Sequence, residues 1–60
     1  MYVLLIERDI PGLCDAGAVV VLSGGGTPDT GDWVAIASSE EVRLARYQGQ
    51  VFSHCVTAII

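Results

Sequence analysis

Three consecutive valines, Val19 to Val21, constrain the fold of this chain more than any other feature. Each valine carries two heavy atoms on its Cβ, which restrict the side-chain rotamers and favour a β-strand over a helix. The valines lie within the segment 18–23, Ala-Val-Val-Val-Leu-Ser, whose first five residues are all apolar. The sequence therefore predicts a β-strand at 18–23 with apolar side chains on both of its faces.

Three further segments have the apolar and β-branched composition of strands. The first of them contains four consecutive apolar residues, and in so short a chain we expect a second subunit to cover one of its faces. Alternation in the second segment places Val34 and Ile36 on one face. Alternation in the third places Phe52, His54 and Val56 on one face. The three segments are 2–8, 32–38 and 50–59.

Glycine and proline separate these strands. Residues 9–17 contain one proline and two glycines, so we expect a structured loop with at most one helical turn, which Asp9 is placed to cap. Residues 24–31, Gly-Gly-Gly-Thr-Pro-Asp-Thr-Gly, are the longest break in the chain. They predict a long loop that joins segments 18–23 and 32–38 into a hairpin.

Residues 39–48 fit two patterns. Ser38 and Glu41 have the spacing of a capping box, which begins a helix. A helix would scatter the apolar side chains around its circumference, whereas a strand places Val42 and Leu44 on one face. We therefore favour a strand and keep a short helix as the alternative.

These elements predict a single small domain over residues 1–60 that is mostly β. We expect a small barrel or a curled antiparallel sheet of four or five short strands, with one short helix at 39–48 as the alternative element. No apolar run approaches the roughly 20 residues that cross a membrane. Cys14 and Cys55 form no Cys-x-x-Cys pair, and no signal peptide is recognisable, which indicates reduced thiols and a cytoplasmic location.

The charge and the apolar content indicate which partners to expect. Seven acidic residues, three arginines and no lysine give a net charge of −4. Nucleic-acid binding relies on cations that meet phosphates, so this balance argues against it, whereas it suits a protein partner with a basic surface. Apolar residues make up 52% of the chain, more than a domain of 60 residues has room to bury, which predicts a homo-oligomer.

A glycine-rich segment and two arginines form a candidate small-molecule site. Consecutive glycine N–H groups bind anions, and an arginine fork holds a phosphate. The lack of lysine excludes a Walker-type phosphate loop, and arginines three positions apart share a face only on a helix. A flexible loop tip is therefore the favoured interpretation, and a nucleotide or other anionic ligand between subunits is the alternative. The residues of this alternative site are Gly24, Gly25, Gly26, Thr27, Arg43 and Arg46.

Ser53, His54 and Cys55 bring a base and two nucleophiles together in the sequence. On a strand, His54 points away from both of its neighbours and therefore cannot deprotonate either of them. Together with Cys14, these side chains also lack the spacing of zinc sites. We therefore predict a protein that is not an enzyme, with no catalytic residue, no metal and no cofactor, in which both cysteines are inert thiols.

Three aromatic side chains, Trp33, Tyr47 and Phe52, are interface candidates, because large amphipathic aromatics are favoured at binding hot spots. Packing in the core is the competing interpretation. As a whole, the sequence predicts a small acidic interaction module that associates with itself and binds, or inhibits, another protein. A homo-oligomer that holds a nucleotide-like anion at its subunit interfaces is the alternative, and a purely structural assembly subunit is the third hypothesis.

Overall fold

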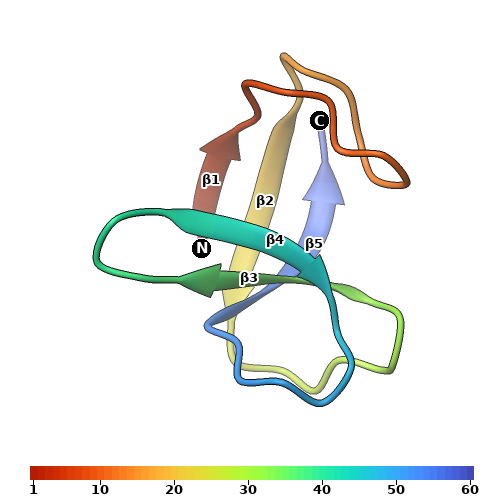
Figure 1. The fold of residues 1–60 in the computed structure, drawn as a ribbon, viewed down its shortest axis with the longest axis vertical. Helices are drawn as coiled ribbons and strands as arrows, with labels where there is room; N and C mark the ends of the chain where they lie inside the picture. Colours follow the sequence, from red (N-terminus) through yellow and green to blue (C-terminus); the bar gives the residue numbers. More distant parts are fainter.

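Five antiparallel strands and no helix make up this protein, as its computed structural model shows for residues 1–60 (Figure 1). The strands form one sheet in the order β1-β2-β5-β3-β4. This result confirms the predicted mostly β fold with a curled antiparallel sheet. No helix in the structure is long and apolar enough to cross a membrane. The strands are β1 (Tyr2–Leu5), β2 (Val19–Gly24), β3 (Trp33–Ala37), β4 (Val42–Arg46) and β5 (His54–Ile59).

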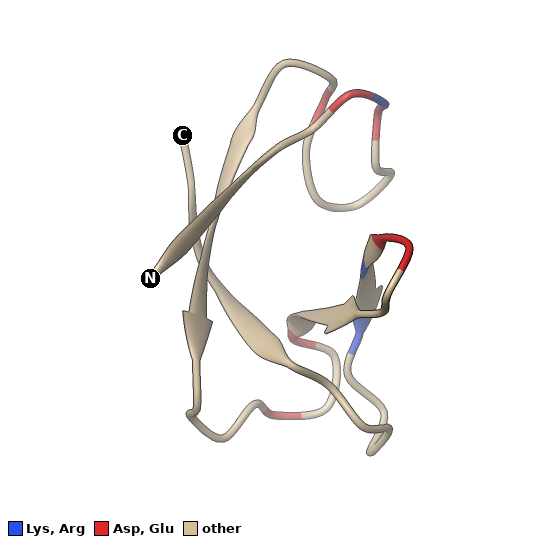
Figure 2. Ribbon diagram, turned by 90° about the vertical axis from the view of Figure 1, so that its left-hand side faces the viewer, with Lys and Arg blue, Asp and Glu red and all other residues tan.

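The sheet curls into a half-barrel with two layers. Strands β1, β2 and β5 form one layer, and the β3–β4 hairpin crosses it (Figures 1 and 2). The pairing register between β2 and β5 shifts between Val21 and Leu22, and such a bulge increases the local bend and twist of a sheet. The Thr57 hydroxyl donates a hydrogen bond of 3.2 Å to the Val21 carbonyl at this point.

The hydrophobic core lies on the inner face of the curled sheet, and it is small. Ile6, Val20, Leu22 and Ala35 form its buried cluster. The structure buries only 5 of its 60 residues, so most apolar side chains stay at least partly in contact with water. The half-buried side chains that pack against the cluster are Leu4, Ile10, Cys14, Leu44 and Val56.

Residues 42–46 form strand β4, which confirms the favoured interpretation of segment 39–48. The hydrogen bonds of Ser38 show why its capping pattern does not begin a helix. The Ser38 hydroxyl accepts from the N–H groups of Glu40 (3.4 Å) and Glu41 (3.2 Å), while the Ser38 N–H donates to the Glu41 carbonyl. The contacts that would cap a helix therefore close the tight turn between β3 and β4.

The predicted hairpin of segments 18–23 and 32–38 is wrong, because β5 lies between β2 and β3. His54 is opposite Gly24 on β2 and opposite Ala35 on β3. Ser53 extends the contact with β3, since both its N–H (2.9 Å) and its hydroxyl (3.0 Å) donate to the Ala35 carbonyl. These hydrogen bonds join segments that are distant in the sequence and place β5 between β2 and β3. Local sequence patterns do not predict such pairings.

Residues 9–17 form the structured loop that the sequence predicts. The N–H groups of Leu13 and Cys14 both donate to the Ile10 carbonyl, which closes one turn. The Asp9 carboxylate accepts from the Ala16 N–H at 2.8 Å, so it bridges the two ends of the loop and does not cap a helix.

Candidate functional site

The most distinctive surface of this protein is an apolar face on the layer formed by β1, β2 and β5. The strand register places Val3 opposite Val21, and Val21 opposite Ala58. It also places Leu5 opposite Val19, which exchanges two backbone hydrogen bonds with Ile60 (3.0 and 2.8 Å). Residues that are directly opposite project from the same side of a sheet. We call this surface the outer face; its members are Val3, Leu5, Val19, Val21, Ala58 and Ile60.

Strand periodicity explains why this face is apolar. Along β2, Val20 and Leu22 point into the core and are buried, so the alternate residues Val19 and Val21 must point outward. A run of apolar residues therefore supplies both the core and the outer face. The sequence prediction of two apolar faces on this strand is confirmed, and within the chain only one of these faces is covered.

The outer face is exposed and uncharged. Val3 retains 67%, Leu5 61% and Ile60 80% of its accessible surface. Strands β1, β2 and β5 contain no Asp, Glu, Arg or Lys, and Figure 2 shows the charged residues confined to the loops and the β3–β4 hairpin. Contiguous exposed apolar patches often mark interaction sites.

The structure does not bring together the residues of the predicted anion site. Gly25, Gly26 and Thr27 line a hollow of about 240 Å³, but the charged side chain beside them is the carboxylate of Asp32. A carboxylate at this position opposes the binding of a phosphate.

Both arginines of that predicted site lie elsewhere, on the two faces of β4. Arg46 donates to the Gly31 carbonyl at 2.8 Å, and its guanidinium carbon lies 5.0 Å from the centroid of the Trp33 ring. Arg43 is opposite Ile36 and exposed, three positions before Arg46. Because side chains alternate along a strand, the two guanidinium groups cannot clamp one phosphate.

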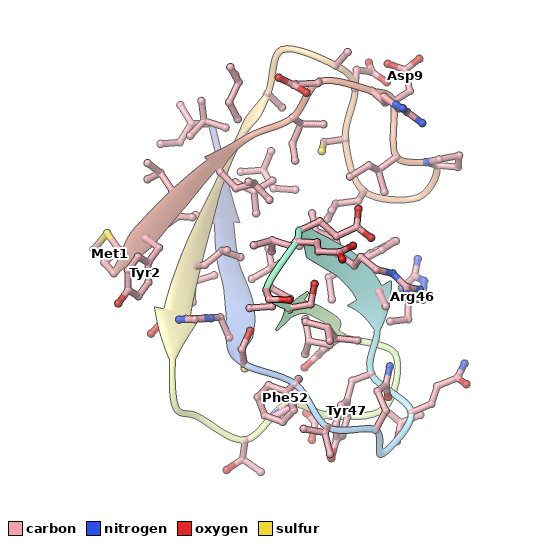
Figure 3. The ribbon with its side chains drawn as sticks, turned by 60° about the vertical axis from the view of Figure 1, so that its left-hand side comes forward. Met1, Tyr2, Asp9, Arg46, Tyr47 and Phe52 are labelled. Carbon is pink, nitrogen blue, oxygen red and sulfur yellow. The ribbon has the colours of Figure 1, made fainter.

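The three aromatic side chains predicted for an interface make contacts within the chain. The rings of Tyr47 and Phe52 meet edge-to-face with centroids 5.4 Å apart, and Figure 3 shows them together below the hairpin. The Trp33 ring packs against the Arg46 guanidinium, and Figure 3 shows Arg46 on the side of the molecule away from Met1. All three aromatics are half-buried, and their role in an interface stays a prediction.

His54 and the two cysteines occupy separate environments. The His54 ring meets the Tyr2 ring edge-to-face with centroids 4.9 Å apart, and it also lies beside Gly24. The Cys55 thiol donates to the Gly25 carbonyl at 3.6 Å, and Cys14 packs against the core. Both cysteines are free and half-buried.

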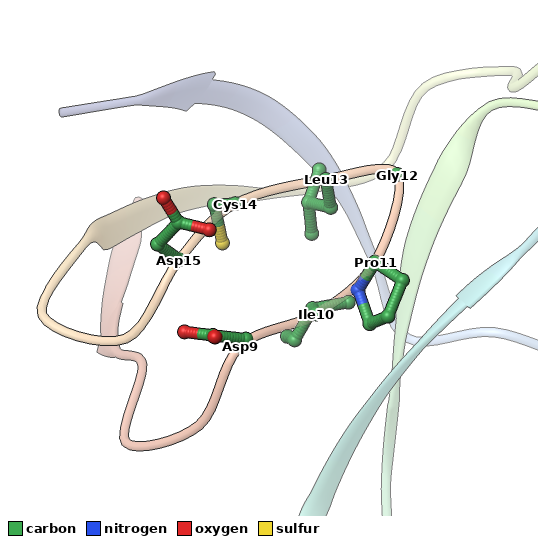
Figure 4. A pocket seen from close by; sticks show the side chains of 7 residues that line it. All are labelled: Asp9, Ile10, Pro11, Gly12, Leu13, Cys14 and Asp15. Atoms are coloured by element: carbon green, nitrogen blue, oxygen red, sulfur yellow. The ribbon is translucent and has the colours of Figure 1, made fainter.

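A hollow of about 370 Å³ lies in the loop between β1 and β2, with the carboxylates of Asp9 and Asp15 at one end and Pro11 at the other (Figure 4). The Asp9 carboxylate already accepts the Ala16 N–H. No group of three or more His, Cys, Asp or Glu side chains has the geometry to hold a metal ion. The hollow therefore offers a cation two carboxylates at most, one of them engaged.

These observations define a small, curled, all-β domain with one uncovered apolar sheet face. No protein-family model, curated protein sequence or solved structure matches the chain in comparisons with known proteins. The sequence pointed to apolar strands with two faces, but it could not show that β1, β2 and β5 lie side by side and combine these faces into one surface.

Proposed function

We propose that this protein is a non-enzymatic interaction module that associates with a second copy of itself through the outer face. One observation carries the proposal: three adjacent strands contain no charged residue and expose apolar side chains together. An uncharged partner surface suits such a face, because a charged group buried against it would lose its hydration without gaining a counter-charge. The outer face of a second copy meets this requirement and is self-complementary, as a symmetric dimer demands.

The exposed apolar surface is large enough for a reversible dimer. Full burial of an aliphatic side chain stabilises by about 1.5–3 kcal/mol. Covering the exposed fractions of Val3, Leu5 and Ile60 therefore contributes about 3–6 kcal/mol per subunit, or about 6–12 kcal/mol for a symmetric pair. Association costs roughly 4–15 kcal/mol, and at the lower end of that cost about 2–8 kcal/mol remain, so we expect a weak dimer that forms at high concentration.

The distribution of charge is compatible with this arrangement. Each chain carries a net charge of −4, but the charged residues lie away from the β1–β2–β5 layer (Figure 2). Two such layers packed face to face lie about 10 Å apart. The charged loops lie outside this contact. At physiological ionic strength, the repulsion between charges more than about 8 Å apart is largely screened.

The test is the mass of the protein in solution as a function of concentration. We expect native mass spectrometry and sedimentation velocity to show a monomer at low micromolar concentration and a dimer at several hundred micromolar. A monomer at every concentration would overturn the proposal. So would a monomer that floats with phosphatidylcholine vesicles, because the outer face would then be a lipid contact.

A further inference from the structure

The open side of the half-barrel contains a second candidate surface. Strands β1 and β4 are the two edges of the sheet, and each has only one neighbour. A groove of about 460 Å³ lies between the end of β1 and β4. Leu4, Ile10 and Leu44 line it and also pack against the buried core, so the floor of the groove is an exposed side of the core.

Strand β4 presents hydrogen-bonding groups to this groove. The Ser38 N–H donates to the Glu41 carbonyl before β4, and the Tyr47 N–H donates to the Asp32 carbonyl after it. The backbone groups of residues at odd positions along β4 therefore bond to β3. In an antiparallel pair the residues between them direct their N–H and C=O groups to the free side. Val42 and Leu44 therefore offer backbone groups at the free edge while their side chains line the groove.

The rim of the groove is acidic. Glu7 and Asp9 lie on one side and Glu41 on the other, with Arg8 as the single cation. In Figure 2 the acidic turn after β1 and the acidic turn between β3 and β4 face each other across the opening. A second copy of this chain is a poor occupant, because it repeats the same acidic rim and carries seven acidic residues against three arginines.

We propose that this groove binds an extended segment of a different protein, which adds as a strand to the free edge of β4. The free backbone groups of Val42 and Leu44 supply the hydrogen bonds, and the apolar floor takes alternate apolar side chains of the segment. The carboxylates of Glu7 and Glu41 select lysine or arginine at its ends. This inference names a partner chemistry for the interaction module and does not rest on the outer face.

The first experiment measures the fluorescence anisotropy of a fluorescein-labelled nonapeptide, KKVTVTVKK, titrated with the protein. We expect saturable binding, and no binding of the acidic peptide EEVTVTVEE. Glu41→Lys should weaken binding about fivefold, because it reverses one charge on the rim. Glu40→Lys is the matched control: it makes the same change in net charge one residue earlier, outside the groove, and should change the affinity less than about twofold. Equal effects of the two variants would overturn the proposed site.

The second experiment tests strand addition. The same peptide with alternate backbone nitrogens methylated lacks the donors that a strand needs, and we expect it not to bind. Amide hydrogen exchange should show new protection at Val42 and Leu44 when the unmodified peptide is bound. Protection at β1 and none at β4, or unchanged binding of the methylated peptide, would overturn the assignment.

The two proposals fail separately. A dimer that ignores the peptide would overturn the groove and leave self-association intact. A protein that binds the peptide but stays monomeric at every concentration would overturn self-association alone. Repeating the titration with Val3→Asp, a change on the outer face, should give the affinity of the unmodified protein.

Discussion

Replacing Val3 by aspartate should separate the dimer without unfolding the subunit. Val3 lies on the outer face, where 67% of its surface is exposed, so its side chain contributes little to the folded monomer. We therefore expect Val3→Asp to lower the free energy of unfolding of the monomer by less than about 1 kcal/mol. Circular dichroism should show an unchanged β spectrum.

The effect on the dimer follows from the same exposed fraction. Two thirds of the value of a buried valine is about 1–2 kcal/mol per subunit, and in a symmetric contact the loss occurs twice. The dissociation constant should therefore rise about 30- to 1,000-fold. The desolvation of the two new carboxylates raises it further. Sedimentation velocity over the same concentration series should therefore show a monomer up to several hundred micromolar, where the unmodified protein is a dimer.

Val51 provides the matched control. It is 88% exposed and lies in the loop between β4 and β5, away from the outer face. Val51→Asp makes the same chemical change and gives the same net charge, and it should leave the dissociation constant within about twofold. If Val51→Asp and Val3→Asp weaken the dimer equally, net charge controls association and the outer face is not the contact. If neither variant weakens it, another surface holds the dimer together.

Three further predictions concern the core, the glycine loop and ligands. Leu22→Ala removes a core side chain that is 4% exposed, and it should destabilise the fold by about 2–5 kcal/mol in urea denaturation; a loss below 1 kcal/mol would contradict the described core. Gly26→Ala, at φ +88°, should cost about 1–2 kcal/mol, whereas Gly24→Ala places its Cβ at an ordinary 3.7 Å from the His54 ring and should cost less; the reverse order would contradict the loop geometry. ATP, AMP and inorganic phosphate should leave the melting temperature unchanged in a thermal-shift assay, because Asp32 rather than an arginine faces the glycine loop; a rise that saturates with ligand concentration would restore the anion-binding alternative.

Local chemistry was enough to predict the strands and the fold class, a curled antiparallel sheet. The valines of segment 18–23 and the alternation of segment 32–38 predicted β2 and β3. The observed β2 is shifted by one residue, to 19–24, and β3 is one residue shorter at each end, at 33–37. Segment 39–48 was harder, because Ser38 has the same hydrogen-bonding groups for capping a helix and for closing a turn. Only the placement of Val42 and Leu44 on one face favoured the strand.

Pairing between distant segments is what local patterns could not supply. The hairpin prediction failed because β5, which follows β2 by thirty residues, inserts between β2 and β3. The predicted anion site required the arginines to lie beside the glycine loop. In the structure, Arg46 instead contacts the Gly31 carbonyl and the Trp33 ring. The sequence also could not predict the outer face, because this surface forms only when β1, β2 and β5 pair side by side.

The central position of β5 has a consequence for how the chain folds. The β3–β4 hairpin closes through a short turn and can form early, but β5 must find two partners at once, with Cys55 opposite both Ser23 and Val34. Contacts so distant in sequence require the closure of long loops before they contribute any stability, which slows folding. Docking of β5 is therefore the step expected to limit the folding rate. Until that step is complete, both β2 and β3 present an unpaired edge, and the chain is then most prone to associate wrongly.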